Sequence, residues 1–249
     1  MKISGIVITL NEENNISDCL KSMRLCCDEL VVVDSGSTDR TVVIASQMGA
    51  RVLKNDWDGF GPQKNFALNN ATHDWILSMD ADERMTIPLA SAIKDVVKSG
   101  KYDVYSFERR TRAYGKWIKY SGWGNDYVSR LFKRKVTSFS DDKVHEKLNT
   151  YGLKVKLLRG HILHFRNDCL ESALSRMDQY SSLWAEQNVN RKAGGVFIGV
   201  FKFLWTFFRM YFLKLGVLDG KAGMIICFTS SFGSFAKYVK LFLLQKSSK

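Results

Sequence analysis

Three carboxylates lie within four positions where the apolar run WILSM meets DADER, at Asp80, Asp82 and Glu83. Asp80 and Asp82 project to the same side of the chain if the backbone stays extended. Two carboxylates held this close repel each other unless a positive charge lies between them. A hard divalent cation with oxygen ligands, Mg²⁺ or Mn²⁺, supplies that charge, and such ions usually hold phosphate groups as well. The alternative is a solvated acidic turn that caps the next helix.

The elements around this cluster favour the metal site over the acidic turn. Short apolar runs rich in β-branched residues predict strands, and the stretches between them have helical spacing. This alternation predicts an α/β fold with a mainly parallel sheet covered by helices. Ligands of such sheets bind beyond the carboxyl ends of the strands, where Asp34 and Asp80 both lie. We expect strands over residues 3–10, 29–34, 51–54 and 74–79.

The second half of the chain has a different pattern. Beyond residue 100 we expect longer, antiparallel strands with interleaved basic and aromatic residues, and then a helix over 168–190. Five cysteines without metal-ligand spacing predict reduced core thiols, and therefore a cytoplasmic protein. The run ISGIVITL is short and lacks a cleavage site, so we expect no signal peptide.

Positive charge is concentrated in the C-terminal part of the chain. The formal net charge is +12, and residues 190–249 hold ten Lys/Arg against one acid, Asp219. The apolar segment 196–218 is 23 residues long, enough to span a bilayer as a helix, but Lys202 and Arg209 interrupt it on one face. We therefore expect a helix that lies in the membrane interface. The aromatic residues expected to face the acyl chains are Phe201, Trp205, Phe208 and Phe212.

Two other interpretations of this tail remain. In one, its helices would pack on the preceding α/β domain as ordinary core; in the other, its basic residues would bind nucleic acid. The apolar content of the tail disfavours nucleic acid, because a phosphate-tracking surface is polar.

Three motifs in order resemble the family 2 glycosyltransferases of GT-A fold. They are TLNEENNI (9–16), VVVDSGSTDRT (31–41) and WILSMDADE (75–83), and the resemblance covers roughly residues 3–190. Later segments resemble a subgroup, the bacterial lipopolysaccharide inner-core β-1,4-glucosyltransferases, which transfer glucose from UDP-glucose to a core heptose. Those segments are SGWGNDYVSRLFKR (121–134), SDDKVHEKL (140–148) and HILHF (161–165).

The resemblance assigns a nucleotide-sugar site. Asp34 is expected at the uridine base or ribose, with Asn11 and Glu12 lining the same pocket. Asp80 is expected near the ribose or metal-bound water, and Asp82 as the direct metal ligand. Lys64 is expected to contact a phosphate, although a solvated helix lysine is an equal alternative.

The resemblance also assigns residues to proton transfer, metal binding and acceptor binding. Glu146 is the expected general base, with Asp142 and Asp141 as rivals, because an attacking sugar hydroxyl must lose its proton. His164 is expected as an extra metal or pyrophosphate ligand. Arg130 and Trp123 suit an anionic, phosphorylated sugar acceptor, and the alternative for that segment is a solvated basic strand face.

Together these expectations describe an inverting, metal-dependent glycosyltransferase of the lipopolysaccharide core. The transferase domain is expected over residues 1–190 and a helical membrane-interface segment over 191–249. The expected partners are a UDP-sugar donor, a lipid-anchored core oligosaccharide and the inner face of the inner membrane, but no nucleic acid. The alternatives are a polyprenyl-phosphate glycosyltransferase and a non-catalytic nucleotide-sugar-binding module.

Overall fold

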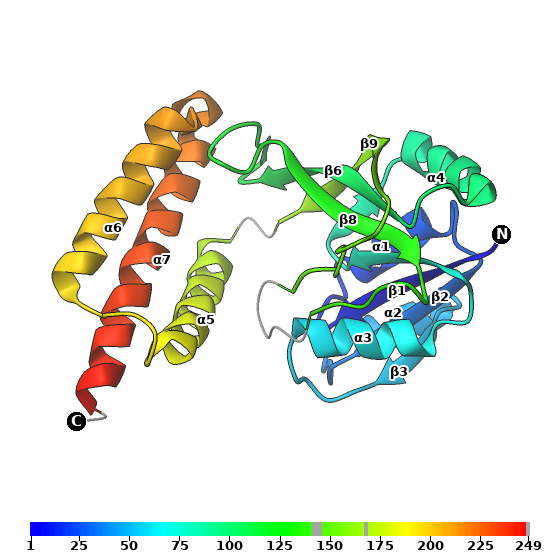
Figure 1. Ribbon diagram of the computed structural model, residues 1–249, viewed down its shortest axis with the longest axis horizontal. Coiled ribbons are helices and arrows are strands. Elements are labelled where there is room, and N and C mark those ends of the chain that lie inside the picture. Colours follow the sequence, from blue (N-terminus) through cyan, green and yellow to red (C-terminus); the bar gives the residue numbers. More distant parts are fainter. Residues whose placement is uncertain (141–145, 167–168, 248–249) are drawn as a thin grey trace. The chain divides into compact units, whose positions relative to one another are not determined.

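The chain forms two compact units (Figure 1). The computed structural model describes residues 1–140, 146–166 and 169–247. Unit 1 comprises Met1–Arg110 and Asp126–Phe165, and unit 2 comprises Thr111–Asn125 and Arg166–Lys249.

Unit 1 is built on a mixed sheet whose first half is parallel. The strands lie in the order β3-β2-β1-β4-β8-β6-β9-β5. β1 pairs in parallel with both β2 and β4, and β8 joins β4 in the antiparallel sense. The strands are β1 Ile3–Thr9, β2 Glu29–Asp34, β3 Arg51–Lys54, β4 Trp75–Asp80, β5 Glu83–Met85, β6 Val104–Ala113, β8 Asp126–Lys133 and β9 Val155–Phe165.

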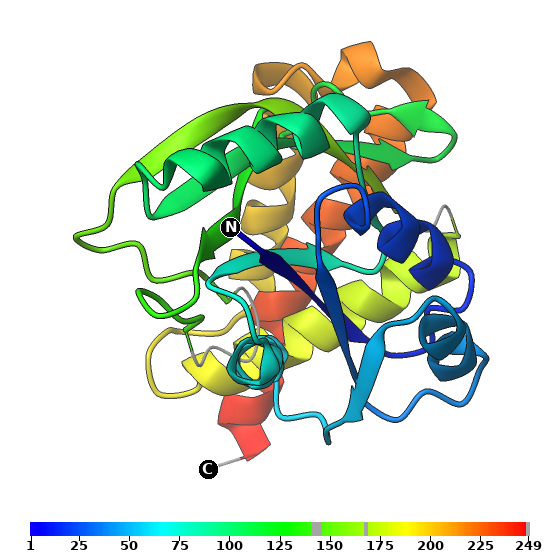
Figure 2. The same ribbon diagram turned by 90° about the vertical axis from the view of Figure 1, so that its right-hand side faces the viewer.

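Helices cover both faces of the parallel strands, which are therefore apolar along their whole length. In β2, Leu30 and Val32 belong to one apolar cluster, which also contains residues of α1 (Ile16–Met23) and α4 (Ile87–Ser99). Val31 and Val33 belong to a second cluster with residues of α3 (Phe60–Asn70). α2 spans Thr41–Gln47. Figure 2 shows the blue strands of this sheet side by side.

The expected strands are confirmed to within one residue. β2 and β3 have the expected bounds, β1 ends at Thr9, and β4 begins at Trp75. The carboxyl ends of β1, β2 and β4 consequently lie at one edge of the sheet, where Asp34 is paired with Thr9 and Asp80 with Ile8.

Unit 2 is mainly helical. α5 (Leu170–Asn188) and α6 (Val196–Phe208) both pack against α7 (Gly220–Ser247), and the short strand β7 (Lys116–Trp117) pairs with the end of β6. α5 packs against α7, so it is grouped with the later helices in unit 2. The domain boundary expected at residue 190 stays a prediction.

The helix expected over 196–218 is shorter in the structure. α6 continues as the π-helix η1 (Arg209–Leu213), and Leu215 then has a left-handed φ of 52° before the 3₁₀-helix η2 (Gly216–Asp219). A Cβ on Gly216 would lie 2.7 Å from Sγ of Cys227. The turn therefore approaches α7 so closely that glycine is required, and the chain reverses there instead of continuing as a helix.

Candidate active site

The loops after β1 and β2 are tied together by Asp34, which is 4% exposed. Its Oδ2 accepts hydrogen bonds from the backbone N–H groups of Gly36 (2.9 Å) and Ser37 (2.8 Å). Its Oδ1 accepts one from Oγ1 of Thr9, at 3.2 Å. Asp34 thus shapes the SGST loop from within. Its expected contact with uridine stays a prediction.

Asn11 and Glu12 lie in the loop after β1 and bind the loop after β2. The N–H of Asn11 donates to Oγ of Ser37 (2.8 Å), and its Oδ1 accepts the N–H of Thr38 (2.8 Å). The N–H of Glu12 donates to Oγ1 of Thr41 at 2.7 Å. Asn11 has a φ of 55°, a region that asparagine tolerates better than most residues. The structure therefore brings all three expected nucleotide-pocket residues to one pair of cross-linked loops.

Lys64 on α3 connects Asp80 with Glu146. Its Nζ lies 3.0 Å from Oδ1 of Asp80 and 2.6 Å from Oε1 of Glu146. The lysine is 3% exposed, so the alternative of a solvated helix lysine is wrong. The general base expected from the sequence therefore lies next to the first aspartate of the DAD segment, joined to it by one ammonium group.

Asp80 has a second cationic partner, Arg130 on β8, whose Nη2 binds Oδ2 of Asp80. Burial raises the pKa of Asp80, but the positive charges of Arg130 and Lys64 outweigh burial and hold that pKa well below its usual range. Asp80 is therefore an ionised carboxylate that is already neutralised by two side chains. This geometry leaves Asp82 as the better metal ligand of the two.

Asp82 lies beside His164 of β9. Nε2 of His164 and Oδ2 of Asp82 are 3.2 Å apart, and the two side chains are 12% and 27% exposed. The backbone fixes this pairing, since the N–H of Phe165 donates to the carbonyl of Asp82 at 2.8 Å. A carboxylate and an imidazole at this distance suit one divalent cation.

These two residues fit Mg²⁺ or Mn²⁺ as a site with few protein ligands. In the part of the chain that the structure describes, no group of three or more His, Cys, Asp or Glu side chains could hold a metal. Mg²⁺ commonly binds through one or two carboxylates and completes its shell with water and substrate phosphates. Asp82 and His164 match that arrangement.

The other expected residues lie elsewhere or are engaged differently. Arg130 is 6% exposed and bound to carboxylates, so its expected contact with the acceptor is a prediction that this burial does not favour. Trp123 belongs to unit 2, where the guanidinium of Arg166 lies 4.7 Å from its ring centroid. Asp142 and Asp141 fall outside the described residues, and their roles stay predictions.

Sequence reasoning missed some residues that the geometry shows beside the site. Glu83 was part of the initial acidic cluster but had no role, and it is fully buried against Arg130 at 2.7 Å. Arg109 on β6 reaches Glu83 at 3.3 Å. For Glu83, its position directly after DAD was the one sequence feature that indicated a place beside the candidate active site. For Arg109, no neighbouring sequence feature indicates this.

The fold and these groups define a GT-A glycosyltransferase, and the comparisons with known proteins agree. The model of the family described as "Glycosyl transferase family 2" matches residues 4–159. The chain therefore belongs to glycosyltransferase family 2.

Relatives match over nearly the whole chain. An "Uncharacterized glycosyltransferase" of Rickettsia felis is 30% identical over 99% of this chain and 90% of its own length. The "Lipopolysaccharide core biosynthesis glycosyltransferase LpsC" of Rhizobium meliloti is 28% identical over 97% of this chain and 92% of its own length. These relatives show that the similarity extends beyond the transferase motifs into the helical C-terminal part.

A solved structure has the same fold. S. aureus TarS 1-349 in complex with UDP-GlcNAc matches with a TM-score of 0.51 at 14% identity, over 100% of this chain and 91% of that chain. At this identity the similarity concerns the fold. The expected GT-A architecture is thereby confirmed.

Proposed function

We propose that this glycosyltransferase moves glucose from UDP-glucose to a heptose of the lipopolysaccharide inner core, with inversion at the transferred carbon. The observation that carries the proposal is Lys64, which holds Asp80 and Glu146 together next to the Asp82–His164 pair. The full-length similarity to the lipopolysaccharide core enzyme LpsC supports the acceptor class. The lipopolysaccharide subgroup resemblance of residues 121–165 supports the glucose donor.

Asp82 and His164 would hold the divalent metal, Mg²⁺ or Mn²⁺. When bound, the metal neutralises the negative charge that develops on the departing UDP. The protein's part is to hold the two ligands in place, through the β-sheet pairing that sets His164 beside the DAD segment.

Glu146 would act as the general base. The acceptor oxygen bonds to the anomeric carbon while the bond from that carbon to the diphosphate oxygen breaks, and its electrons leave with UDP. The proton of the acceptor hydroxyl passes to the carboxylate of Glu146. Lys64 orients this carboxylate, since its ammonium group lies 2.6 Å away.

The loops that carry Asn11, Glu12 and Asp34 would bind the nucleotide. Their hydrogen bonds to one another make the surface rigid before the ligand arrives, which lowers the ordering cost of binding. S. aureus TarS was solved with UDP-GlcNAc on the same fold, which supports a UDP-sugar donor.

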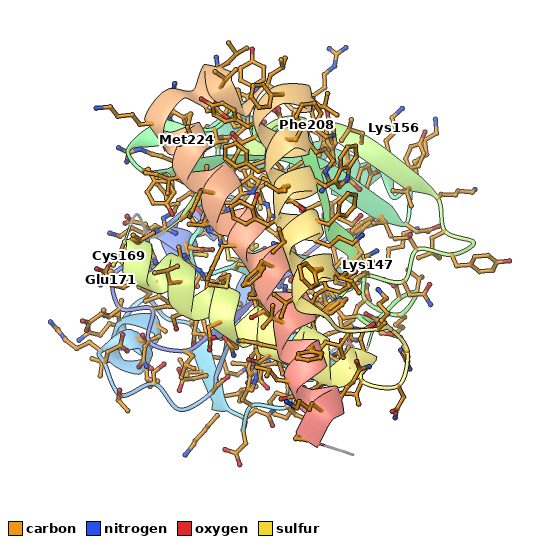
Figure 3. The ribbon with its side chains drawn as sticks, turned by 90° about the vertical axis from the view of Figure 1, so that its left-hand side faces the viewer. Lys147, Lys156, Cys169, Glu171, Phe208 and Met224 are labelled. Atoms are coloured by element: carbon orange, nitrogen blue, oxygen red, sulfur yellow. The ribbon has the colours of Figure 1, made fainter. Side chains whose placement is uncertain are left out.

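The acceptor is a lipid-anchored sugar, so we place the enzyme peripherally on the cytoplasmic face of the inner membrane. α6 presents an apolar face on the side away from α7. Phe197 is 90% exposed and Phe201 64%, and further along this face Leu204, Trp205, Phe208 and Phe212 are exposed as well. Figure 3 looks onto unit 2 and labels Phe208 on α6 and Met224 on α7.

The charges on α6 favour a lipid surface as the partner of this face. Thr206 is 9% exposed and hydrogen-bonded to Ser234 of α7, which marks the side of α6 that packs. Lys202 is partly exposed, with its Nζ 5.7 Å from the ring centroid of Tyr238 on α7, and Arg209 is exposed. Basic residues flanking an apolar stripe suit a helix in the plane of an anionic membrane.

In the described residues, one helical stretch has the length and composition of a membrane span, Val196–Leu213, with a mean hydropathy of 1.5. Length and composition are weak support for spanning. The two internal basic residues disfavour it, because each costs about 2.5–3.5 kcal/mol at the centre of a bilayer.

A thermal-shift series with nucleotide sugars tests the donor and the metal. We expect UDP-glucose to raise the unfolding temperature only when Mn²⁺ or Mg²⁺ is present. Stabilisation by GDP or CMP sugars in its place contradicts the donor assignment.

Transfer of radiolabelled glucose tests the acceptor. We expect labelling of a heptose-terminated core lipid. Polyprenyl phosphate is the competing acceptor, because an apolar membrane-facing helix suits it equally well. Labelling of polyprenyl phosphate alone replaces the proposed acceptor with this one.

A further inference from the structure

The third carboxylate of the DADE segment has no part in the chemistry above, yet it is the most buried of the three. Glu83 begins β5 and is 0% exposed. Its Oε2 accepts the backbone N–H of Asp80 at 3.0 Å, and its Oε1 accepts Nη2 of Arg130 at 2.7 Å. Glu83 therefore binds Asp80 directly through the backbone and indirectly through Arg130.

Glu83 also separates two guanidinium groups. Nη1 of Arg109 lies 3.3 Å from the same Oε1 that Arg130 uses, and Nε of Arg109 donates to Asp126 at 2.7 Å. Burial lowers the pKa of Arg130, but Asp80 and Glu83 outweigh burial and raise it above its ordinary value. Without Glu83, the buried guanidinium of Arg130 and the partly buried guanidinium of Arg109 would repel each other, and Arg130 would keep Asp80 as its carboxylate partner.

The backbone of Glu83 contacts the other half of the expected metal site. In the antiparallel pairing of β5 with β9, Glu83 lies opposite His164. The side chain thus fixes Asp80 and the main chain fixes the strand that carries His164. Asp82 lies between Asp80 and Glu83 in the sequence. Its position is therefore constrained on one side by the hydrogen bond of Glu83 to Asp80 and on the other by the pairing of Glu83 with His164.

We propose that Glu83 is a positioning residue for the donor site: it holds Arg130 and the backbone of Asp80 so that Asp80 and the Asp82–His164 pair bind the metal–diphosphate end of the donor. This inference rests on the proposed function. A merely structural buried glutamate would affect the stability of the free protein and leave its affinity for the donor unchanged.

The test compares Glu83→Gln with the wild-type protein by calorimetric titration of UDP in the presence of Mn²⁺. Glutamine keeps the shape but loses the charge that both arginines need. We expect the Kd for UDP to rise about tenfold or more, the effect of losing a hydrogen bond to a charged group. Glu83→Asp, which keeps the charge on a shorter side chain, is expected to recover part of the affinity.

The matched control is Glu108→Gln, which removes another carboxylate–arginine pair on β6. Glu108 binds Arg110 at 3.0 Å and is partly exposed, so its loss is expected to leave the Kd unchanged. A double variant of Glu83→Gln with Arg130→Lys should bind UDP no more weakly than Arg130→Lys alone, because Glu83 acts largely through Arg130.

The outcomes separate this inference from the proposed function. If the wild-type protein does not bind UDP with Mn²⁺, the proposed donor fails and the positioning role fails with it. If the wild type binds UDP and folded Glu83→Gln binds it equally well, the positioning role alone is wrong. Should Glu83→Gln not fold, Glu83→Asp makes the same comparison, and unchanged affinity in that variant overturns the proposal.

Discussion

Lys64 places one positive charge between two carboxylates that have different expected tasks. Asp80 is expected on the donor side, and Glu146, 82 positions further along the chain than Lys64, is the expected base. When the base accepts a proton, its attraction to Lys64 weakens, and Lys64 is then drawn more strongly to Asp80. In the proposed reaction, Lys64 would therefore link the base and the donor side electrostatically.

The base can be tested by Glu146→Gln. Glutamine keeps the hydrogen bond to Lys64 but cannot take a proton, so we expect kcat to fall about 10²–10⁴-fold with little change in the Kd for UDP-glucose. Steady-state kinetics and calorimetry measure the two effects. Near-normal kcat in this variant, together with an inactive Asp142→Asn, moves the role to Asp142.

The metal ligand can be tested by Asp82→Ala. Its side chain is 27% exposed and lies in the turn between β4 and β5, so the fold should persist while the metal is lost. We expect no transfer at any Mn²⁺ concentration and no UDP-dependent rise in unfolding temperature. Asp95→Ala, at an exposed position on α4, is the control. Wild-type turnover of Asp82→Ala in excess Mn²⁺ shows that the metal binds elsewhere.

The expected site residues that the structure brings together are those with a local signal in the sequence. Asp80 and Asp82 lie where an apolar strand ends, and Glu146 lies within SDDKVHEKL (140–148), one of the segments that carry the resemblance. Arg130 has no such signal for its actual partners, because β8 joins β4 only in the folded sheet. Its basic and aromatic neighbours suggested a surface, and the buried carboxylates that it meets come from a different part of the chain.

At the scale of elements, the start of β2 is fixed by Glu29. Its carboxylate accepts hydrogen bonds from the N–H and Oγ1 of Thr72 (2.9 Å each) and from Arg51 at 3.0 Å. Burial raises the pKa of Glu29, but hydrogen bonds from Ser4, Thr72 and Arg51 outweigh burial and lower it to about 2. Glu29 thereby links β1, β2, β3 and the chain leading into β4.

This pKa predicts a pH dependence of stability. A carboxyl group whose pKa is lower in the folded protein stabilises the fold above its unfolded pKa and loses that effect as pH falls toward about 2. Glu29→Gln should therefore lower the free energy of unfolding at pH 7 by about 1.5–3 kcal/mol, the range for hydrogen bonds to a charged group. The difference from wild type should shrink steadily from pH 5 to pH 3.

Urea unfolding across this pH range measures the difference. Glu186→Gln, at an exposed position on α5, is the control and should show no such trend. A deficit in Glu29→Gln that stays constant between pH 7 and pH 3 contradicts the role of the ionised carboxylate.

The bounds of β2 and β3 followed from their short apolar runs in the sequence, whereas the chain reversal after α6 did not. The continuous apolar run of β2 left little choice of register, because both of its faces are covered. Beyond α6 and η1, Gly216 lies close to Cys227 of α7, and those two residues come together only after the chain has reversed. Hydrophobic periodicity along the sequence cannot predict such a contact between residues of two different helices.

At the scale of the whole molecule, each unit has its own chemistry. Unit 1 contains the ionised groups of the expected reaction, and unit 2 contains the exposed aromatic face of α6 and most of the net positive charge. The one acid in the C-terminal segment, Asp219, is 2% exposed and accepts hydrogen bonds from Tyr120 (3.0 Å) and Ser121 (2.8 Å). The carboxylate of Asp219 is therefore buried and hydrogen-bonded within unit 2, and the exposed charged side chains of residues 190–247 are basic.

The final prediction concerns attachment to the membrane. The wild-type protein should sediment with vesicles that contain phosphatidylglycerol and be released by high salt or alkaline carbonate. Lys202→Glu with Arg209→Glu should weaken vesicle binding at least about tenfold, since each basic residue near an anionic surface contributes about 1 kcal/mol. The folding of unit 1 and the binding of UDP should be unchanged.

The control variant makes the same charge change on unit 1, Lys94→Glu with Lys98→Glu on exposed positions of α4, and it should bind vesicles like the wild type. Phe201→Ser tests the apolar contribution separately, because it removes a side chain that is 64% exposed and packs little within unit 2. If the wild type stays with the vesicles through carbonate and is released only by detergent, Val196–Leu213 spans the bilayer, and α6 does not lie in the interface.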